Sequence, residues 1–196
     1  MRVYRKLFPF DLAQFRAHLL RLSPGDRRCR FFGGISDAGI ADYCARIDWY
    51  RTAIIGCFDG GTLRGAVELH SAAPLVMRAA EVAVTVEPDW QDRGIGTDLL
   101  RRAIVFARNR GLAAISMLCL TDNRRMQAIA RKLDSALSFA EGDVAADLRL
   151  PFPTQVSLLE EAFADGAGLF GAWWDCIAER HLSPATAGWR SAPPSQ

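Results

Sequence analysis

The stretch VEPDWQDRGIGTDLL, residues 86–100, joins an alternating apolar run to an amphipathic one through a corner that carries two glycines. Glycine costs about 1 kcal/mol relative to alanine inside a helix, so Gly94 and Gly96 indicate a tight bend or the close approach of another group. Residues 80–86 before the corner alternate as a strand does, and Ile95 opens a broad apolar helical stripe that ends at Gly111. The stretch therefore predicts a strand, a turn and a helix.

The rest of the chain predicts further short elements in a definite order. Strands are expected at residues 3–7, 52–58, 63–70, 113–120, 136–139 and 144–150. Helices are expected at residues 11–22, 37–47 and 124–133, with a break at the SPGD of residues 23–26 and with Ser36 as a cap. DGGT at residues 59–62 predicts a hairpin, and the two-residue link after Gly111 predicts a parallel strand pair. The predicted order is βααβββαβαββ.

Composition and charge narrow the class of protein. The chain has 196 residues, half of them hydrophobic, and a net charge of +2, which argues against partners such as nucleic acid or an anionic membrane. Five widely spaced cysteines without a CxxC predict free thiols rather than disulfides or a metal site. No apolar run approaches the roughly 20 residues of a membrane span, and no secretory signal is visible. We expect a cytoplasmic protein in which the arginines of residues 27–30 are solvated.

The glycine corner admits several interpretations. A dinucleotide-binding turn needs a third glycine where Leu99 stands, and a P-loop needs a lysine followed by Ser or Thr, which Thr97 and Asp98 do not supply. One interpretation that remains is a helix entry with glycines chosen for packing. The other is an anion site made by free backbone N–H groups at a helix N-terminus, with added charge from Arg93 and Arg124.

The motif QDRGIG at residues 91–96 resembles the Q/R-x-x-G-x-G/A signature of the GNAT N-acetyltransferase superfamily, at the same place between a strand and a long helix. The resemblance covers residues 2–150. It implies an α/β (α+β) fold with a mixed, mostly antiparallel sheet of about six or seven strands and flanking helices. RLSPGDRRCRFF at 21–32 and AAEVAVTVEPDWQDRGIG at 79–96 are similar to the acetyltransferase domain of bacterial Pat-type protein-lysine acetyltransferases. In those enzymes a large acyl-CoA-synthetase-like region is attached, and this sequence does not contain one.

The resemblance also implies acetyl-CoA (coenzyme A) as co-substrate, without a metal. Its pyrophosphate is expected on the amides of residues 91–97 and its pantetheine arm along residues 81–86. The implied cofactor-binding residues are Val84, Thr85, Val86, Gln91, Asp92, Arg93, Gly94, Ile95, Gly96, Thr97 and Asn123. Asn123 has a simpler alternative role as a helix cap.

Acetyl transfer to an amine needs a base near the nucleophile, and Glu81 is the leading candidate because the matching position in the Pat-type domains is a glutamate with that role. The alternatives are Glu68 and His70, or a Glu81 that only pairs with an arginine. A main-chain N–H near Thr85 or Val86 is expected to hold the thioester oxygen. Many family members carry a tyrosine as general acid seven residues after the asparagine, where this chain has Ala130.

The sequence thus predicts three regions: a catalytic domain at residues 1–150, a helical C-terminal extension at 151–183 and a disordered tail at 184–196. The predicted function is N-acetyl transfer from acetyl-CoA to an amine acceptor, either a protein lysine or a small molecule, with a homodimer possible. The alternative is a CoA-binding regulatory or interaction module with little or no catalysis. Residues 11–47 and the extension are expected to shape the acceptor pocket. Trp173 and Trp174 have three open roles: filling the domain's own groove, forming a dimer contact or lining that pocket.

Overall fold

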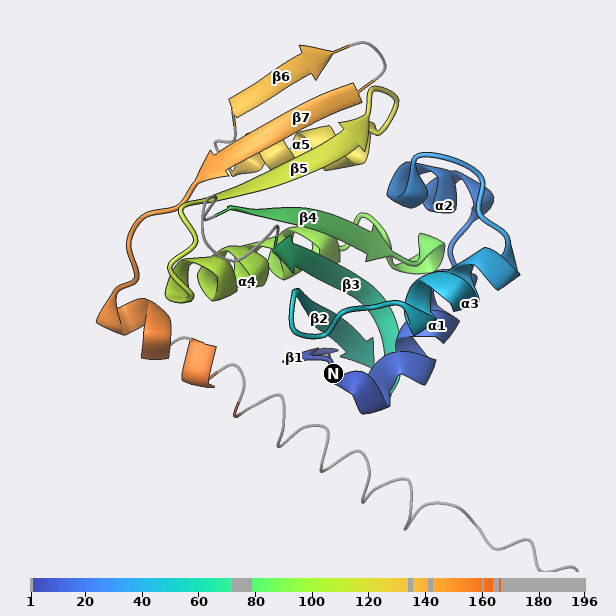
Figure 1. The fold of residues 1–196 in the computed structure, drawn as a ribbon, viewed down its shortest axis with the longest axis horizontal. Helices are drawn as coiled ribbons and strands as arrows, with labels where there is room; N and C mark the ends of the chain where they lie inside the picture. The colour runs from blue at the N-terminus through green and yellow to red at the C-terminus, as the bar shows by residue number, and fades with distance from the viewer. Residues whose placement is uncertain are drawn as a thin grey trace, which may run out of the picture.

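A computed structural model describes residues 2–71, 79–133, 136–140, 143–159, 161–163 and 166. Its centre is a seven-stranded sheet in the order β1-β2-β3-β4-β5-β7-β6 (Figure 1). The strands are β1 Arg2–Lys6, β2 Thr52–Asp59, β3 Thr62–Ser71, β4 Ala79–Val86, β5 Ala114–Leu120, β6 Ala136–Ala140 and β7 Asp143–Arg149. β4 and β5 run parallel, and the other neighbouring strands run antiparallel. The predicted fold class and the parallel pair are confirmed.

Helices cover both faces of the sheet. They are α1 Leu12–Leu20, α2 Pro24–Phe31, α3 Asp37–Ala45, α4 Ile95–Asn109 and α5 Arg124–Lys132, with short 3-10 turns η1 Pro9–Asp11 and η2 Pro88–Trp90. Ile54 packs with α1 and α3, whereas its neighbour Ile55 packs with α4, because successive strand side chains point to opposite faces. Two buried apolar cores result, one on each face of the sheet (Figure 1).

The turn and cap signals of the sequence form as predicted. Gly60 and Gly61 take positive φ angles of 54° and 73° in the β2–β3 hairpin, and Gly111 follows α4 at 72°. The Ser36 hydroxyl accepts a hydrogen bond from the Gly39 amide, so it caps α3. These elements could be located from sequence because each turn depends on residues next to it in the chain.

The prediction is wrong at residues 23–26, where it places only a break between helices. Ser23 caps a further helix, α2: its hydroxyl accepts from the Asp26 amide at 3.1 Å, and Pro24 takes the first helical position. Serine at the cap, proline at the first position and an acid at the third are signals of a helix start. α1 has already ended at Leu20, and these four residues begin α2, which packs against β4 and β5.

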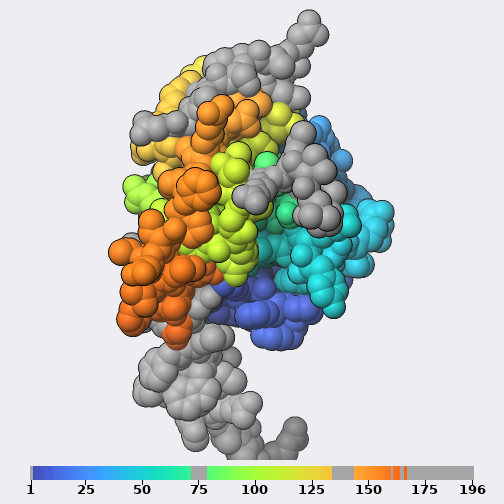
Figure 2. Space-filling view, turned by 60° about the vertical axis from the view of Figure 1, so that its left-hand side comes forward, coloured from blue at the N-terminus to red at the C-terminus, as the bar shows by residue number. Residues whose placement is uncertain are grey.

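The C-terminal extension begins with helical residues 155–159 and 161–163. Ser157 is fully buried, and its hydroxyl donates to Asn109 Oδ1 at 2.6 Å, which fixes the segment to the end of α4. Figure 2 shows this orange segment along one side of the molecule. The part of the predicted helix that follows Gly166 lies outside the described residues, and so do Trp173 and Trp174. The predicted tail also lies outside them. In the part of the chain that the structure describes, no helix has the length and apolar character to cross a membrane.

Candidate functional site

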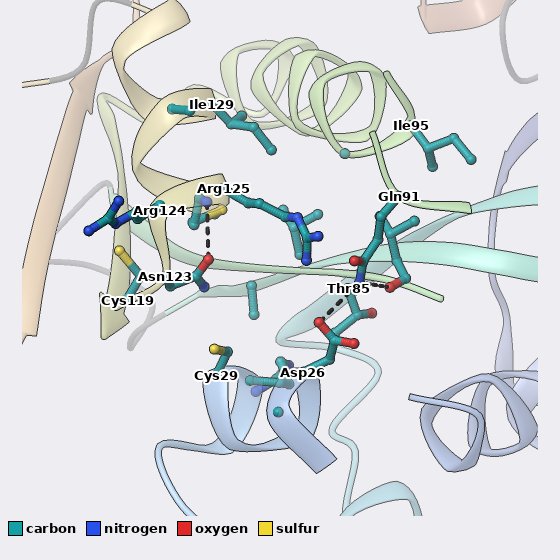
Figure 3. A pocket seen from close by; sticks show the side chains of 18 of the residues that line it. Asp26, Cys29, Thr85, Gln91, Ile95, Cys119, Asn123, Arg124, Arg125 and Ile129 are labelled. Carbon is teal, nitrogen blue, oxygen red and sulfur yellow. Dashed lines mark hydrogen bonds between the residues drawn. The ribbon is translucent and has the colours of Figure 1, made fainter. Parts of the chain in front are cut away.

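The site is a gap in the sheet between β4 and β5. The two strands pair only at Ala79↔Ala114, Ala80↔Ile115 and Glu81↔Ser116, although β4 continues to Val86 and β5 to Leu120. Beyond Glu81 the strands therefore diverge, and a pocket of about 920 Å³ occupies the space between them (Figure 3). α2, β4, the glycine corner, the end of β5 and α5 all contribute to its lining.

The open edge of β4 carries unpaired main-chain groups. The main-chain N–H of Glu87 donates to the Arg64 carbonyl at 3.0 Å, which continues the β3–β4 ladder. In an antiparallel pair every second residue bonds to the same neighbouring strand, so residues 85 and 83 also form their main-chain hydrogen bonds with β3. Val84 and Val86 therefore turn their N–H and C=O groups toward the gap. Gln91 Nε2 donates to the Val86 carbonyl at 3.0 Å, which agrees with that direction.

Because of this register, the polar groups of Thr85 do not face the gap. Its main-chain N–H faces β3, and its hydroxyl lies 2.9 Å from His18 Nε2 in a buried cluster with Glu87. Of the two amides expected to hold a thioester oxygen, only that of Val86 points into the gap. Thr85 lines the pocket without offering a free polar group there.

The geometry of the glycine corner is compatible with both roles that the sequence left open. Gly94 has a φ of +82° and stands at the N-terminus of α4, where no side chain caps the free amides. A β-carbon on Gly96 would lie 3.1 Å from Ile129 Cδ1 of α5 and 3.8 Å from Val84 Cγ1, so glycine here allows close packing against α5, and a larger residue would require Ile129 to shift. The first turn of α4 still lines the pocket, with its N–H groups available to an anion.

Arginines beside the corner differ from expectation. Arg124 and Arg125 line the pocket, and Arg125 Nη2 lies 3.5 Å from Asp92 Oδ2 (Figure 3). Arg93 does not line the pocket, because its guanidinium lies over the Trp90 ring at 5.2 Å. The structure thus places the basic charge on α5 rather than on the corner itself.

The arginines of α2 are not simply solvated, contrary to the sequence prediction. Arg30 is largely buried and bonds Glu68 Oε1 through Nε at 3.0 Å and Nη2 at 2.7 Å. Arg27 pairs with Asp37 at 2.7 Å, and the more exposed Arg28 pairs with Asp122 at 2.6 Å across the mouth of the pocket. These contacts made by α2 fix one wall of the pocket.

Glu68 and His70, the alternative bases, are not among the residues that line the pocket. Burial alone would raise the pKa of Glu68, but Arg30, His70 and the Tyr43 hydroxyl hold the pKa of this carboxyl at about 2. His70 Nδ1 lies 3.1 Å from the Thr52 hydroxyl and Nε2 lies 3.6 Å from Glu68. Both groups belong to a network that supports the wall.

Glu81 lies at the last paired position of β4, exposed and on the pocket lining, directly across the ladder from His70. No arginine pairs with Glu81 among the described residues. The alternative of a carboxylate held in an ion pair therefore has no support in the geometry. Glu81 is the acid that the fold brings to the narrow end of the gap.

Asn123 caps α5, since Oδ1 accepts from the Met126 amide at 3.1 Å, and the residue also lines the pocket, so its predicted role in cofactor binding stays a prediction. Ala130 is 1% exposed within the core and does not reach the pocket, and no tyrosine stands among its described lining residues. The described part of the extension also lies away from the pocket, beside α4 and β1, so its expected contribution to an acceptor pocket is not found.

No cluster of three or more His, Cys, Asp or Glu side chains suited to a metal ion occurs within the described residues. Sequence reasoning missed α2 and with it Asp26, whose Oδ1 accepts from Gln91 Nε2 at 3.0 Å (Figure 3). The signal for α2 was present in Ser23 and Pro24. The contact with Gln91 was not predictable, because 65 residues separate the partners.

Comparisons with known proteins agree with this geometry. Residues 26–134 match the model of the Acetyltransferase (GNAT) family. The acetyltransferase PA5475 of Pseudomonas aeruginosa is 32% identical over 139 residues, which are 69% of this chain and 73% of that protein.

Solved structures share the fold. The GNAT domain of S. lividans PAT superposes with a TM-score of 0.66 at 22% identity, over 75% of this chain and 89% of that one. The PaiA N-acetyltransferase of Thermoplasma acidophilum, solved in complex with coenzyme A, gives a TM-score of 0.57 at 18% identity over 76% and 99% of the two chains. The chain therefore belongs to the GNAT acetyltransferase family and is an acyl-CoA-dependent N-acyltransferase.

Proposed function

We propose that this chain transfers an acetyl group from acetyl-CoA to the amine of a small molecule or a protein lysine, with Glu81 as the general base. The observation that carries the proposal is the divergence of β4 and β5 directly after Glu81. It exposes a strand edge, an uncapped helix N-terminus and the carboxylate of Glu81 along a single pocket.

Each part of the pocket suits one part of the acyl donor. The amides at the start of α4, with Arg124 and Arg125 nearby, suit the pyrophosphate, since a helix N-terminus attracts anions. The free C=O group of Val84 and the free N–H group of Val86 suit the amides of the pantetheine arm, which would then lie as an added strand beside β4. The coenzyme A found with the related PaiA enzyme supports this choice of donor.

Glu81 is positioned to take the proton that the acceptor amine must lose. An alkylammonium is not nucleophilic, so its nitrogen attacks the thioester carbonyl only after a base has removed that proton. The Val84 N–H, which faces the gap and lies nearer to Glu81 than that of Val86, then donates to the thioester oxygen as negative charge develops on it. As the C–S bond breaks, the former amine nitrogen gives up its second proton to water, and water passes a proton to the departing thiolate. A model cysteine thiol titrates at about 8.5, so this leaving group needs little acid catalysis and tolerates Ala130.

The test is acetyl transfer from acetyl-CoA to a panel of small amines and lysine peptides, followed by release of the free thiol. Glu81→Gln should lower kcat by about 10²–10⁴-fold and leave the Kd for acetyl-CoA unchanged. Asp42→Asn, an exposed acid on α3, is the matched control and should retain full activity. Unchanged turnover in Glu81→Gln would remove Glu81 from the mechanism. Binding of acetyl-CoA without turnover on any amine would instead support the CoA-binding module.

A further inference from the structure

A buried polar cluster lies behind the end of β4, on the face of the sheet that α1 covers. At its centre is His18 of α1, which is 0% exposed, beside Thr85 at 6% and Glu87 at 4%. His18 Nε2 lies 2.9 Å from the Thr85 hydroxyl, and Nδ1 lies 3.2 Å from Glu87 Oε1. Arg21 of α1 and Arg64 of β3 also bond the Glu87 carboxylate, at 2.8 Å and 3.0 Å. We call these five residues the His18 cluster.

The partners of His18 determine which of its nitrogens carries the proton. Burial alone would raise the pKa of Glu87, but the hydrogen bonds of the cluster hold this pKa at about 2, so the ionised carboxylate only accepts. Nδ1 of His18 therefore carries the proton. Burial lowers the pKa of His18, so the ring is neutral and Nε2 keeps a free lone pair. The Thr85 hydroxyl donates to that lone pair, because its other acceptor, the Ala66 carbonyl, is more distant at 3.5 Å.

The His18 cluster supports a part of β4 that has only one neighbouring strand. Beyond Glu81 the strand pairs with β3 alone, because β5 has diverged. Thr85 stands between Val84 and Val86, whose main-chain groups face the gap without a strand to pair with. The Thr85 hydroxyl and the Glu87 carboxylate join this segment to α1. The cluster therefore gives the open edge of β4 a second attachment besides its ladder with β3.

We propose that His18 is a positioning residue for the acyl donor, which holds the open edge of β4 in place through the Thr85 hydroxyl. The proposal rests on the proposed function, in which the Val84 carbonyl and the Val86 N–H receive the pantetheine arm. A neutral imidazole suits this role because one nitrogen donates while the other accepts, so a single ring joins a buried carboxylate to a buried hydroxyl. Without that bond, the ladder with β3 alone holds the edge that meets the donor.

The test measures the affinity of the full-length chain for coenzyme A by calorimetry. Thr85→Val keeps the shape of the side chain but removes the hydroxyl, and it should raise the Kd about fivefold, as the loss of one hydrogen bond predicts. Thr85→Ser retains the hydroxyl and should restore the Kd of the unaltered protein. The matched control is Ser36→Ala, which removes the cap of α3 away from the pocket. It should lower the unfolding midpoint by roughly 2–4 °C and leave the Kd unchanged.

A double variant tests whether His18 and Thr85 act through one bond. His18→Asn keeps an N–H near the position of Nδ1 and removes the acceptor at Nε2, so it should raise the Kd about as much as Thr85→Val does. Together the two changes should weaken binding no further than either alone. An unchanged Kd in Thr85→Val, an equal loss in Ser36→Ala or additive losses in the double variant would each overturn the proposal. Turnover does not enter these measurements, so a failure of Glu81 as the base would not alter their outcome.

Discussion

Replacing Arg30 by methionine tests the strongest electrostatic contact that holds α2 to the sheet. Arg30 is 11% exposed at its side chain, and it makes two of the hydrogen bonds that keep Glu68, 1% exposed, ionised. Removing one partner of a buried ion pair leaves an uncompensated charge and costs about 3–5 kcal/mol. In a chain of this length that corresponds to a fall of roughly 6–20 °C in the unfolding midpoint.

The control is Arg28→Met on the same helix, because Arg28 and its partner Asp122 are both more than half exposed. The unfolding midpoint of Arg28→Met should equal that of the unaltered protein within the error of the measurement. The double variant Arg30→Met, Glu68→Gln should recover most of the lost stability, since it no longer buries an unpaired charge. If Arg30→Met and Arg28→Met unfold at the same urea concentration, the assignment of α2's anchorage to this pair is wrong.

The pH dependence of the same variants gives a second check. The pKa of Glu68 is about 2 in the folded protein and about 4.5 ordinarily, so its contribution to stability is complete above pH 4.5 and is lost between pH 4.5 and 2. In Arg30→Met, burial without the guanidinium raises the pKa of Glu68 above its ordinary value, and this group then favours folding in acid. The stability difference between the two proteins should therefore narrow as the pH falls from 4.5 to 2. A constant difference across that range would refute the reasoning.

Three further outcomes are expected. Gly94→Ala forces a β-carbon into the left-handed region and should destabilise the protein by roughly 1–2 kcal/mol in urea unfolding, whereas Gly25→Ala on α2 should not. Gly96→Ala places a β-carbon 3.1 Å from Ile129 Cδ1 and should weaken acetyl-CoA binding by calorimetry, with recovery when Ile129→Val makes room. Burial lowers the pKa of His18 below 6.5, so this group destabilises the protein as the pH falls below 6.5, and His18→Gln should flatten that slope.

Local sequence signals were enough to predict most of the fold. The hairpin at Gly60 and Gly61, the cap at Ser36 and the turn at Gly94 depend on conformations that only neighbouring residues determine. The turn that opens α4 was predictable for the same reason, because the glycine corner is one continuous stretch. The error at Ser23 arose because serine, proline and glycine in succession are typical of a loop as well as of a helix start.

The wall of the site was not predictable, since its contacts join distant parts of the chain. Arg30 and Glu68 are 38 residues apart, and Arg28 and Asp122 are 94 apart. A solvated arginine on a helix and a buried one have the same sequence environment until the sheet is placed beside them. The direction of the Val86 amide likewise depends on the register of β3 against β4, which no local pattern determines.

The contacts of α2 divide into two classes with different consequences for the site. Arg30 joins the helix to the centre of β3 through a buried carboxylate, so this contact contributes to the stability of the whole fold. Asp26 and Arg28 reach Gln91 and Asp122, which lie on the two sides of the gap, through partly or largely exposed contacts. Exposed ion pairs break at little cost and are screened by salt. We therefore expect the contacts at the mouth of the gap to break at lower cost than the ion pair at Glu68, so that the proposed acyl donor could enter between α2 and α5 while that ion pair stays intact.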